Sequence, residues 1–536
     1  MEPPDVRKFG LDDSRGVVLG QASNGDRLYY NGDADIMVFA RKGAGKGIGF
    51  VLPNLRDYEG SMVVLDPKGE NTIVSAALRR SKGHRVVVLD PFGKTTPHTG
   101  IPSDTYNPLS ALTYADPNDL GPGIEAMADA LIIVSPHERE PHFTMGGKKF
   151  LAFLMWFMVA HLPPEDRNLI TLYDLAHGGR EKFDRIATVM TEGRSKDPNV
   201  ARVCRALGNW YQGRTEREFS YFESVSSNHL GWLGDFVWSS VLAGPPSPPL
   251  PLKTQKITLY LVLPFERVER YQRWLRLMVA DCLATLYATH GAPKLPVFFL
   301  FDEAAAGLGK MDVLLNATAA SRSFGARLCF VYQNFTQVSD LYGAAYETFI
   351  ANAGVKLFFS VDDMKAAEFI ARRCGQKTTP VPGVPQGVAE PLIRVEQIFQ
   401  LPPDEIIGLI TSAPPARFGR LNVWTDNRYA GLAPNATHGE PEERIYTART
   451  DYEPVDLSKI KAKRSPRLDD AYEPQETESE QETSAPGSVV AKNADASEIA
   501  ALAALSNRYK RYVFKHENGR VGYLDDNNNF VPVDAG

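Results

Sequence analysis

The chain has 536 residues, 43% of them hydrophobic and 23% charged, which predicts a globular protein of two or three folded units rather than one core. Its formal net charge is -6, but residues 469–482 hold seven acidic side chains and no basic one. The remainder is close to neutral, so the acidic balance does not exclude a basic channel for nucleic acid.

Cysteines and apolar runs indicate the compartment. The four cysteines are spread singly, without a CxxC pair or zinc-like spacing, which favours a reduced, cytoplasmic environment. The first residues lack the basic region and apolar run of a signal peptide. The apolar run Phe150–Leu162 is shorter than the roughly 20 residues that a helix needs to cross a bilayer. We therefore predict a buried helix there and no transmembrane helix.

The first part of the chain indicates an α/β domain. Residues 1–35 are predicted to be an N-terminal β segment, because a Gly-Asp turn separates two strand-like runs within Val17–Tyr30. Residues 36–110 follow the pattern of strand, glycine loop and helix, with further strands at Ser61–Asp66 and His84–Asp90. This alternation is typical of a parallel sheet covered by helices, and we assign it to the first part of a nucleotide-binding domain.

Residues 111–250 are predicted to form an inserted all-α domain. Strand-like runs disappear there, and aromatic and aliphatic residues recur at helical spacing in Lys148–Val159 and Phe219–Leu233. The second part of the nucleotide-binding domain is predicted over residues 251–448. Its apolar strands are expected at Ile257–Leu263, Val297–Phe301, Arg327–Val331 and Val355–Ser360.

The C-terminal region has a different composition. Residues 449–500 are polar, acidic and rich in Pro, Ser and Glu, which is typical of a disordered linker. Residues 501–536 are predicted to form a small β module. Within it, Tyr509–Leu524 has alternating apolar positions on both sides of Glu517, Asn518 and Gly519, as in a hairpin.

The strongest functional pattern is a glycine-rich loop between a buried strand and a helix, VFARKGAGKGIG from Val38 to Gly49. Such a loop turns successive backbone N–H groups toward phosphates, and a lysine reaches the terminal phosphate. Two positions depart from the general pattern: Ala40 replaces the first glycine, and Gly47 replaces the hydroxyl residue that usually ligates magnesium. The predicted nucleotide-binding residues are Arg41, Lys42, Gly43, Ala44, Gly45, Lys46, Gly47 and Ile48, and the alternative is a glycine-rich helix start without a ligand.

A second pattern is the apolar run VFFLFDE, which ends in Asp302 and Glu303. Asp302 is the predicted magnesium ligand, and Glu303 the group that polarises the attacking water. An acidic pair at a strand end is often a helix cap, but the phosphate loop upstream favours the functional interpretation.

Two further strand ends carry polar candidates. VVLDPKGE places Asp66 and Lys68 at the sheet edge where ligands of α/β proteins collect, although these could also be surface loop charges. RLCFVYQ ends in Gln333, which could sense the γ-phosphate or orient water, or could simply cap the strand. Arg322 and the pair Arg372 and Arg373 are candidates to reach a neighbouring subunit's nucleotide.

Taken together, the motifs FARKGAGKGIGFVLPNL, VVLDPKGE, VVVLDPFG, FLFDEAAAGLGKM and VYQNFTQV resemble those of the type IV secretion coupling ATPases, the TraG-like conjugative DNA-transfer family. The resemblance covers roughly residues 16–409. In that family the phosphate loop is often of the GKG type, so Gly47 departs from the general pattern and not from these relatives.

The resemblance implies a RecA-like P-loop ATPase domain that binds ATP and Mg²⁺, uses Lys46 and Glu303 in catalysis and assembles as a homo-hexamer. It implies DNA with its relaxase, or an effector protein, as substrate, and inner-membrane components of the secretion system as partners. The family's N-terminal membrane anchor is not expected here, which predicts a cytoplasmic protein held peripherally at the inner membrane. The alternatives are a nucleotide-binding adaptor without autonomous turnover and a DNA-segregation pump of the same class.

Overall fold

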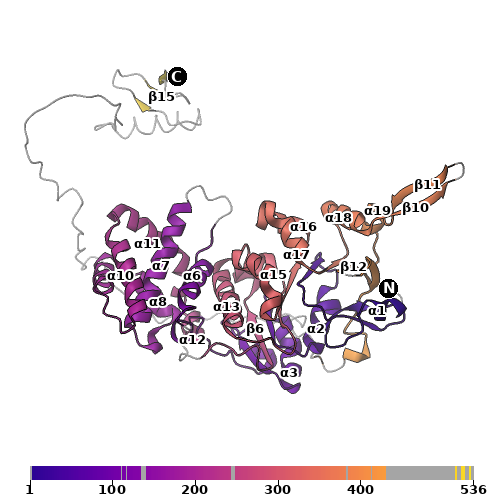
Figure 1. Ribbon diagram of the computed structural model, residues 1–536, viewed down its shortest axis with the longest axis horizontal. Coiled ribbons are helices and arrows are strands. Elements are labelled where there is room, and N and C mark those ends of the chain that lie inside the picture. Colours follow the sequence, from indigo (N-terminus) through magenta and orange to yellow (C-terminus); the bar gives the residue numbers. More distant parts are fainter. Residues whose placement is uncertain are drawn as a thin grey trace, which may run out of the picture. The chain divides into compact units, whose positions relative to one another are not determined.

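The computed structural model describes residues 3–429, with gaps at 110, 116, 135–140, 243–247, 382–383 and 412, and also residues 432, 514–515, 521–524 and 530–532. The chain divides into two units, Met1–Glu442 and Glu443–Gly536. The predicted linker, 449–500, lies outside the described residues. The first unit holds an 11-stranded sheet with helices on both sides (Figure 1).

The large sheet has the strand order β2-β1-β13-β12-β9-β3-β8-β7-β4-β6-β5. The strands β3 to β9 pair in parallel, whereas β12, β13, β1 and β2 add an antiparallel edge. In chain order the strands are β1 (Val17–Gln21), β2 (Arg27–Tyr30), β3 (Ile36–Ala40), β4 (Met62–Asp66), β5 (Arg85–Leu89), β6 (Ile257–Val262), β7 (Val297–Phe301), β8 (Ala326–Tyr332), β9 (Val355–Phe359), β12 (Glu405–Ile410) and β13 (Ala416–Gly419).

Both faces of the parallel part are buried, which explains why its strands are continuous apolar runs in the sequence. Along β4, Val63 and Leu65 belong to the core shared with the inserted helices. Met62 and Val64 point to the opposite face and belong to a second core. The predicted strands from 36 to 360 are all present, so the α/β fold class is confirmed.

The strand order places the ends of five parallel strands side by side. β3 lies between β9 and β8, and β7 lies between β8 and β4. After β3 the chain crosses over two strands to reach β4, while β8 and β9 flank β3 on its two sides. A change of direction of this kind leaves a crevice at the carboxyl ends of the strands, where ligands of α/β proteins bind.

Helices between β5 and β6 form the predicted all-α insertion and gather at one end of the unit (Figure 1). They are α5 (Ala111–Tyr114), α6 (Leu120–Leu131), α7 (Pro141–His161), α8 (Leu169–Ala176), α9 (Arg180–Glu192), α10 (Pro198–Gln212), α11 (Glu216–Leu230) and α12 (Val237–Leu242), and the short helix α4 (Thr96–Thr99) precedes the insertion. The remaining helices are α1 (Pro3–Lys8), α2 (Leu52–Asp57), α3 (Glu70–Ser81), α13 (Val268–Ala288), α14 (Ala304–Leu308), α15 (Asp312–Phe324), α16 (Phe335–Tyr342), α17 (Tyr346–Asn352), α18 (Met364–Cys374) and α19 (Val395–Phe399).

Helix α7 is the centre of the insertion and packs against α6, α10 and α11. By length and composition it is the one helix among the described residues that could cross a membrane, but half of its apolar window is buried within the protein. Phe150, Phe153 and Leu154 are fully buried and contribute to the same core as α13. The prediction of a buried helix at this position is confirmed.

A pair of glycines lets α7 approach α11 closely. A Cβ on Gly146 would overlap the buried ring of Phe222, and a Cβ on Gly147 would lie 2.8 Å from a methyl carbon of Val225. The hydroxyl of Ser226 donates to the carbonyl of Gly147 at 3.1 Å. Glycine lowers helix stability by about 1 kcal/mol relative to alanine, and here it is required by the packing.

One buried arginine connects the insertion to the segment after β7. Arg276 of α13 donates to the carbonyl of Ala130 in the last turn of α6 at 3.2 Å. It also donates to the carbonyl of Leu308, the last residue of α14, at 2.9 Å and to that of Lys310 at 2.6 Å. Helix C-termini carry partial negative charge, so they stabilise the buried guanidinium.

Two small β elements complete the structure. The hairpin of β10 (Gln376–Val381) and β11 (Val384–Pro391) projects from the end of the first unit opposite the insertion (Figure 1). In the second unit, β14 (Phe514–Lys515), β15 (Val521–Leu524) and β16 (Phe530–Pro532) form an antiparallel sheet. The first two of these strands lie within the predicted hairpin, whose central residues 517–519 are outside the described residues.

The close contact at Gly146 predicts that alanine has opposite effects on stability at two glycines. Gly146→Ala should lower the free energy of unfolding by about 1–3 kcal/mol, because the new methyl group overpacks the α7–α11 contact. Gly123→Ala in α6, where a Cβ meets nothing within 4 Å, should raise it by about 0.5–1 kcal/mol through helix propensity. Denaturant unfolding followed by circular dichroism measures both. Equal stabilisation by the two substitutions would contradict the packing interpretation.

Candidate nucleotide site

The glycine loop follows β3 and has the backbone of a phosphate loop. Gly43 and Gly45 have φ angles of 80° and 84°, which glycine adopts without steric cost. The backbone N–H of Ala44 donates to the carbonyl of Arg41 and closes a turn. The chain then enters a π-helical turn, η1 (Gly47–Val51), which continues into α2. A helix N-terminus behind a loop of this kind favours the binding of anions.

Lys46 joins the loop to the end of β7. Its ammonium lies 2.7 Å from Oδ1 of Asp302 and 2.7 Å from Oε1 of Glu303. Burial alone would lower the pKa of Lys46, but the two carboxylates outweigh it and hold this pKa above its ordinary value. The structure thus brings together the three residues that the sequence assigned to phosphate, metal and water.

Gln333, at the end of β8, lies on the other side of Glu303. Its Nε2 donates to Oε2 of Glu303 at 3.0 Å, and its backbone N–H donates to Oε1 of Gln337 at 2.8 Å. This geometry holds the amide of Gln333 beside the carboxylate of Glu303.

Glu303 combines an unusual backbone conformation with an ionised side chain. Its φ of 59° and ψ of 51° lie in the left-handed region, and strain of this kind collects at functional sites. Burial would raise the pKa of Glu303, but the charge of Lys46 and hydrogen bonds from Lys46 and Gln333 hold it below its ordinary value. Glu303 is therefore ionised at neutral pH.

Asp66 contacts the start of α3. Its Oδ2 accepts hydrogen bonds from the backbone N–H and the hydroxyl of Thr72, at 2.8 and 2.7 Å, and so stabilises the first turn of α3. Its Oδ1 is buried without a partner among the described residues. Burial raises the pKa of Asp66 to about 6. Lys68 is exposed, and its charge contributes to the low pKa of Glu303.

The sequence did not single out two side chains near the site. Nδ2 of Asn71 lies 3.5 Å from Oδ2 of Asp302, and it follows the VVLDPKGE motif directly, so its position could have been inferred. Arg420 lies against the glycines of the loop. No local pattern indicates Arg420, because it comes from the antiparallel edge of the sheet.

The arginines proposed to act on a neighbouring subunit are placed differently. Nε of Arg322 lies 2.6 Å from Oδ2 of Asp33 on its own chain. Arg372 and Arg373 are exposed and line a cavity of about 480 Å³ between α16, α17 and α18. Arg373 also lies over the ring of Phe369, 5.3 Å from its centroid. All three arginines are exposed, so each remains a candidate for contact with a second subunit.

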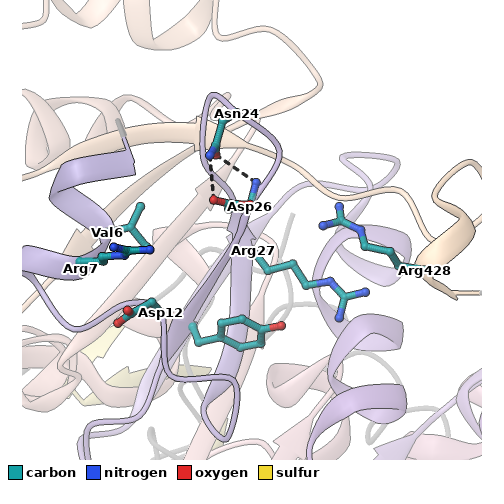
Figure 2. A pocket seen from close by; sticks show the side chains of 8 residues that line it. Val6, Arg7, Asp12, Asn24, Asp26, Arg27 and Arg428 are labelled. Carbon is teal, nitrogen blue, oxygen red and sulfur yellow. Dashed lines mark hydrogen bonds between the residues drawn. The ribbon is translucent and has the colours of Figure 1, made fainter.

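A cavity of about 890 Å³ lies away from the loop, between α1, the β1–β2 hairpin and Arg428 (Figure 2). Two of the arginines that line it are paired within the chain. Arg27 lies 2.7 Å from Asp57, and Arg428 lies 2.7 Å from Asp426. None of the predicted nucleotide-binding residues lines it, so we assign it no part in nucleotide chemistry.

The donor set near Lys46 fits Mg²⁺ that is shared with a nucleotide. Within the described ranges, no group of three or more His, Cys, Asp or Glu residues could hold a metal ion by itself. Mg²⁺ is usually held by one or two carboxylates together with substrate phosphates and water. Asp302 offers such a carboxylate at the end of β7, whereas Gly47 offers no hydroxyl.

The sequence matches one family of known proteins. The family model described as type IV secretory system conjugative DNA transfer matches residues 5–450. The chain belongs to this family. Conjugal transfer protein TraG of Rhizobium radiobacter is 24% identical over 417 residues, which are 73% of this chain and 62% of TraG. Protein VirD4 of Rhizobium rhizogenes is 23% identical over 409 residues, 73% of this chain and 58% of VirD4. The chain thus spans about three fifths of these relatives.

Solved structures of the conjugative coupling protein TrwB have the same fold. An unbound form is 12% identical, with a TM-score of 0.57 over 79% of this chain and 93% of that chain. TrwB in complex with ADP and Mg²⁺ is 14% identical, with a TM-score of 0.56 over 78% of this chain and 92% of that chain. The RecA-like P-loop fold with an inserted all-α domain is therefore confirmed, as is the predicted resemblance.

The environment of Asp66 predicts a pH dependence of stability. A carboxyl group whose pKa rises from 3.8 to about 6 on folding binds more protons in the folded state between these values. The free energy of unfolding should therefore fall as pH rises from 4 to 6, by an amount on the order of 2–3 kcal/mol. Asp66→Asn should remove this slope. Parallel wild-type and variant profiles of unfolding free energy against pH would contradict the assignment.

Proposed function

We propose that this chain is an ATP-hydrolysing motor of the type IV secretion coupling class. The observation that carries the proposal is the contact of Lys46 with both Asp302 and Glu303, at 2.7 Å each, beside a loop with phosphate-binding backbone. In the proposed site, the N–H groups of Gly43 to Gly47 and the ammonium of Lys46 bind the nucleotide phosphates. Arg41, Lys42, Ala44 and Ile48 complete the loop.

Each polar group has a role that its position supports. Asp302 would hold Mg²⁺, which would neutralise charge on the phosphates. Glu303, ionised and at the end of β7, accepts a proton from the attacking water. Gln333 orients that water through its contact with Glu303. Asp66 and Lys68 are proposed as neighbours of the site. The charge of Lys68 acts on Glu303, and Asp66 stabilises the start of α3.

The proposed substrate is DNA with its relaxase, or an effector protein, delivered to a secretion channel. DNA contact would be through phosphates and independent of sequence, and therefore sensitive to salt. The chain would act in the cytoplasm, held at the inner membrane by components of the secretion system. The family membership and the likeness to TrwB support this function over a segregation pump.

The proposed mechanism predicts different defects in two variants, one in nucleotide binding and one in turnover alone. Lys46→Ala should weaken nucleotide binding and abolish turnover, because the cation that contacts the phosphates is lost. Glu303→Gln should retain binding but lower turnover by about 100-fold or more, because the general base is lost. Steady-state phosphate release, measured with and without single- and double-stranded DNA, tests both.

Lys82→Ala is the matched control. Lys82 is exposed and follows the last residue of α3, whereas Asp66 and Lys68 precede its first residue. This substitution should leave both binding and turnover unchanged. Wild-type protein that binds nucleotide but does not hydrolyse it, with or without DNA, would contradict the autonomous motor and favour a nucleotide-holding adaptor. Gly47, which lacks a hydroxyl for the metal, is the observation that keeps the adaptor as the second candidate.

We further propose a homo-hexameric ring in which a neighbour's arginine completes the site. The double substitution Arg372→Ala with Arg373→Ala should then reduce turnover without reducing nucleotide affinity. Mixing this variant with Glu303→Gln subunits should restore part of the activity, because some interfaces combine an intact glutamate with intact arginines. Mixtures that are no more active than the two variants measured separately would exclude these arginines as the trans groups.

A further inference from the structure

The segment after β13 returns to the phosphate loop. We call residues 420–424 the strap. The backbone N–H of Arg420 donates to the carbonyl of Asp404 at 2.6 Å, and that of Val423 donates to the carbonyl of Ile48 at 3.3 Å. Leu421 and Val423 are buried in the same core as Phe50. Because of these contacts, the strap is held against the helical turn that begins in the loop.

Arg420 extends along the loop glycines. A Cβ on Gly49 would lie 2.6 Å from Cγ of Arg420, and a Cβ on Gly45 would overlap its terminal nitrogen Nη1. Nε donates to the carbonyl of Pro403 at 2.8 Å and fixes the direction of the side chain. The guanidinium therefore reaches the residue that directly precedes Lys46.

The charge of Arg420 is not compensated by an ion pair with any described residue. Arg417, three residues earlier, contacts the carboxylate of Glu405, and Arg428 pairs with Asp426 at 2.7 Å. Arg420 is half-buried and makes its side-chain hydrogen bond to a carbonyl through Nε, which leaves the terminal nitrogens directed along the loop. An uncompensated guanidinium at a phosphate loop has the geometry and charge to bind phosphate oxygens.

We propose that Arg420 is a nucleotide-binding residue, supplied by the same chain, whose guanidinium donates to the phosphates held by the loop. This inference rests on the proposed function, since it names a further contact of the same nucleotide. It assigns to the antiparallel edge of the sheet a direct part in binding. Gly45 and Gly49 are then glycines for a second reason, because side chains there would displace Arg420.

Calorimetric titration with ADP and Mg²⁺ tests the proposal on the full chain. Arg420→Met retains the aliphatic contact with Gly49 but removes the charge, and it should weaken binding about tenfold, as expected for loss of a charge-assisted hydrogen bond. Arg420→Lys should lose less affinity than Arg420→Met. Arg417→Met, on the same edge, should bind as the wild type does. Thermal unfolding without nucleotide checks that the variants are folded.

Titration with GDP separates a phosphate contact from a base contact, because both nucleotides carry the same diphosphate. An equal loss of affinity for ADP and GDP in Arg420→Met supports the proposal, and a loss for one of them alone overturns it. Unchanged affinity in Arg420→Met also overturns it while leaving the proposed function intact. Wild-type protein that binds neither ADP nor ATP would instead refute the proposed function itself.

Discussion

The contact between one ammonium and two carboxylates depends on the order of strands in the sheet. Lys46 follows β3, and Asp302 and Glu303 follow β7, more than 250 residues later in the chain. They meet because β8 is the one strand between them, and it contributes Gln333 at the same edge. An insertion or deletion that changed this order would separate the loop from its acids.

The same order explains how the chain accommodates a large helical insertion. The insertion leaves the sheet after β5 and returns at β6, which are the two outermost strands on that side. β4 separates them from β7, so the strands that carry Lys46, Gln333 and Glu303 have unbroken neighbours. The buried residues of α7 share a core with β4 and β7, so the insertion stabilises the sheet without interrupting the site.

Sequence reasoning identified those features that rest on local patterns. Continuous apolar runs marked the parallel strands, because both faces of these strands are buried. The glycine loop and VFFLFDE marked the residues that meet at the sheet edge. β12 and β13 were not predicted as strands, because their short runs depend on pairing with β9 and β1 for their stability. The contact of Arg420 with the loop was missed for the same reason, since it arises from that long-range pairing.

The sequence also did not predict how the side chains at the strand ends are oriented. Asp66 stands at a strand end like Asp302, yet its carboxylate stabilises the start of α3 through Thr72. Two acids at equivalent positions thus have different surroundings, one buried and one beside a lysine. The role of each depends on which helix begins next to it, and the strand pattern contains no information on that point.

Arg276 couples the positions of two helices. Its guanidinium holds the last turn of α6 and the end of α14 at once, and α14 begins directly after Glu303. Sliding of α14 along its axis must either carry α6 with it or break hydrogen bonds in a buried, water-poor place, which is costly. The helix that follows Glu303 and the helical insertion are therefore coupled through Arg276 of α13.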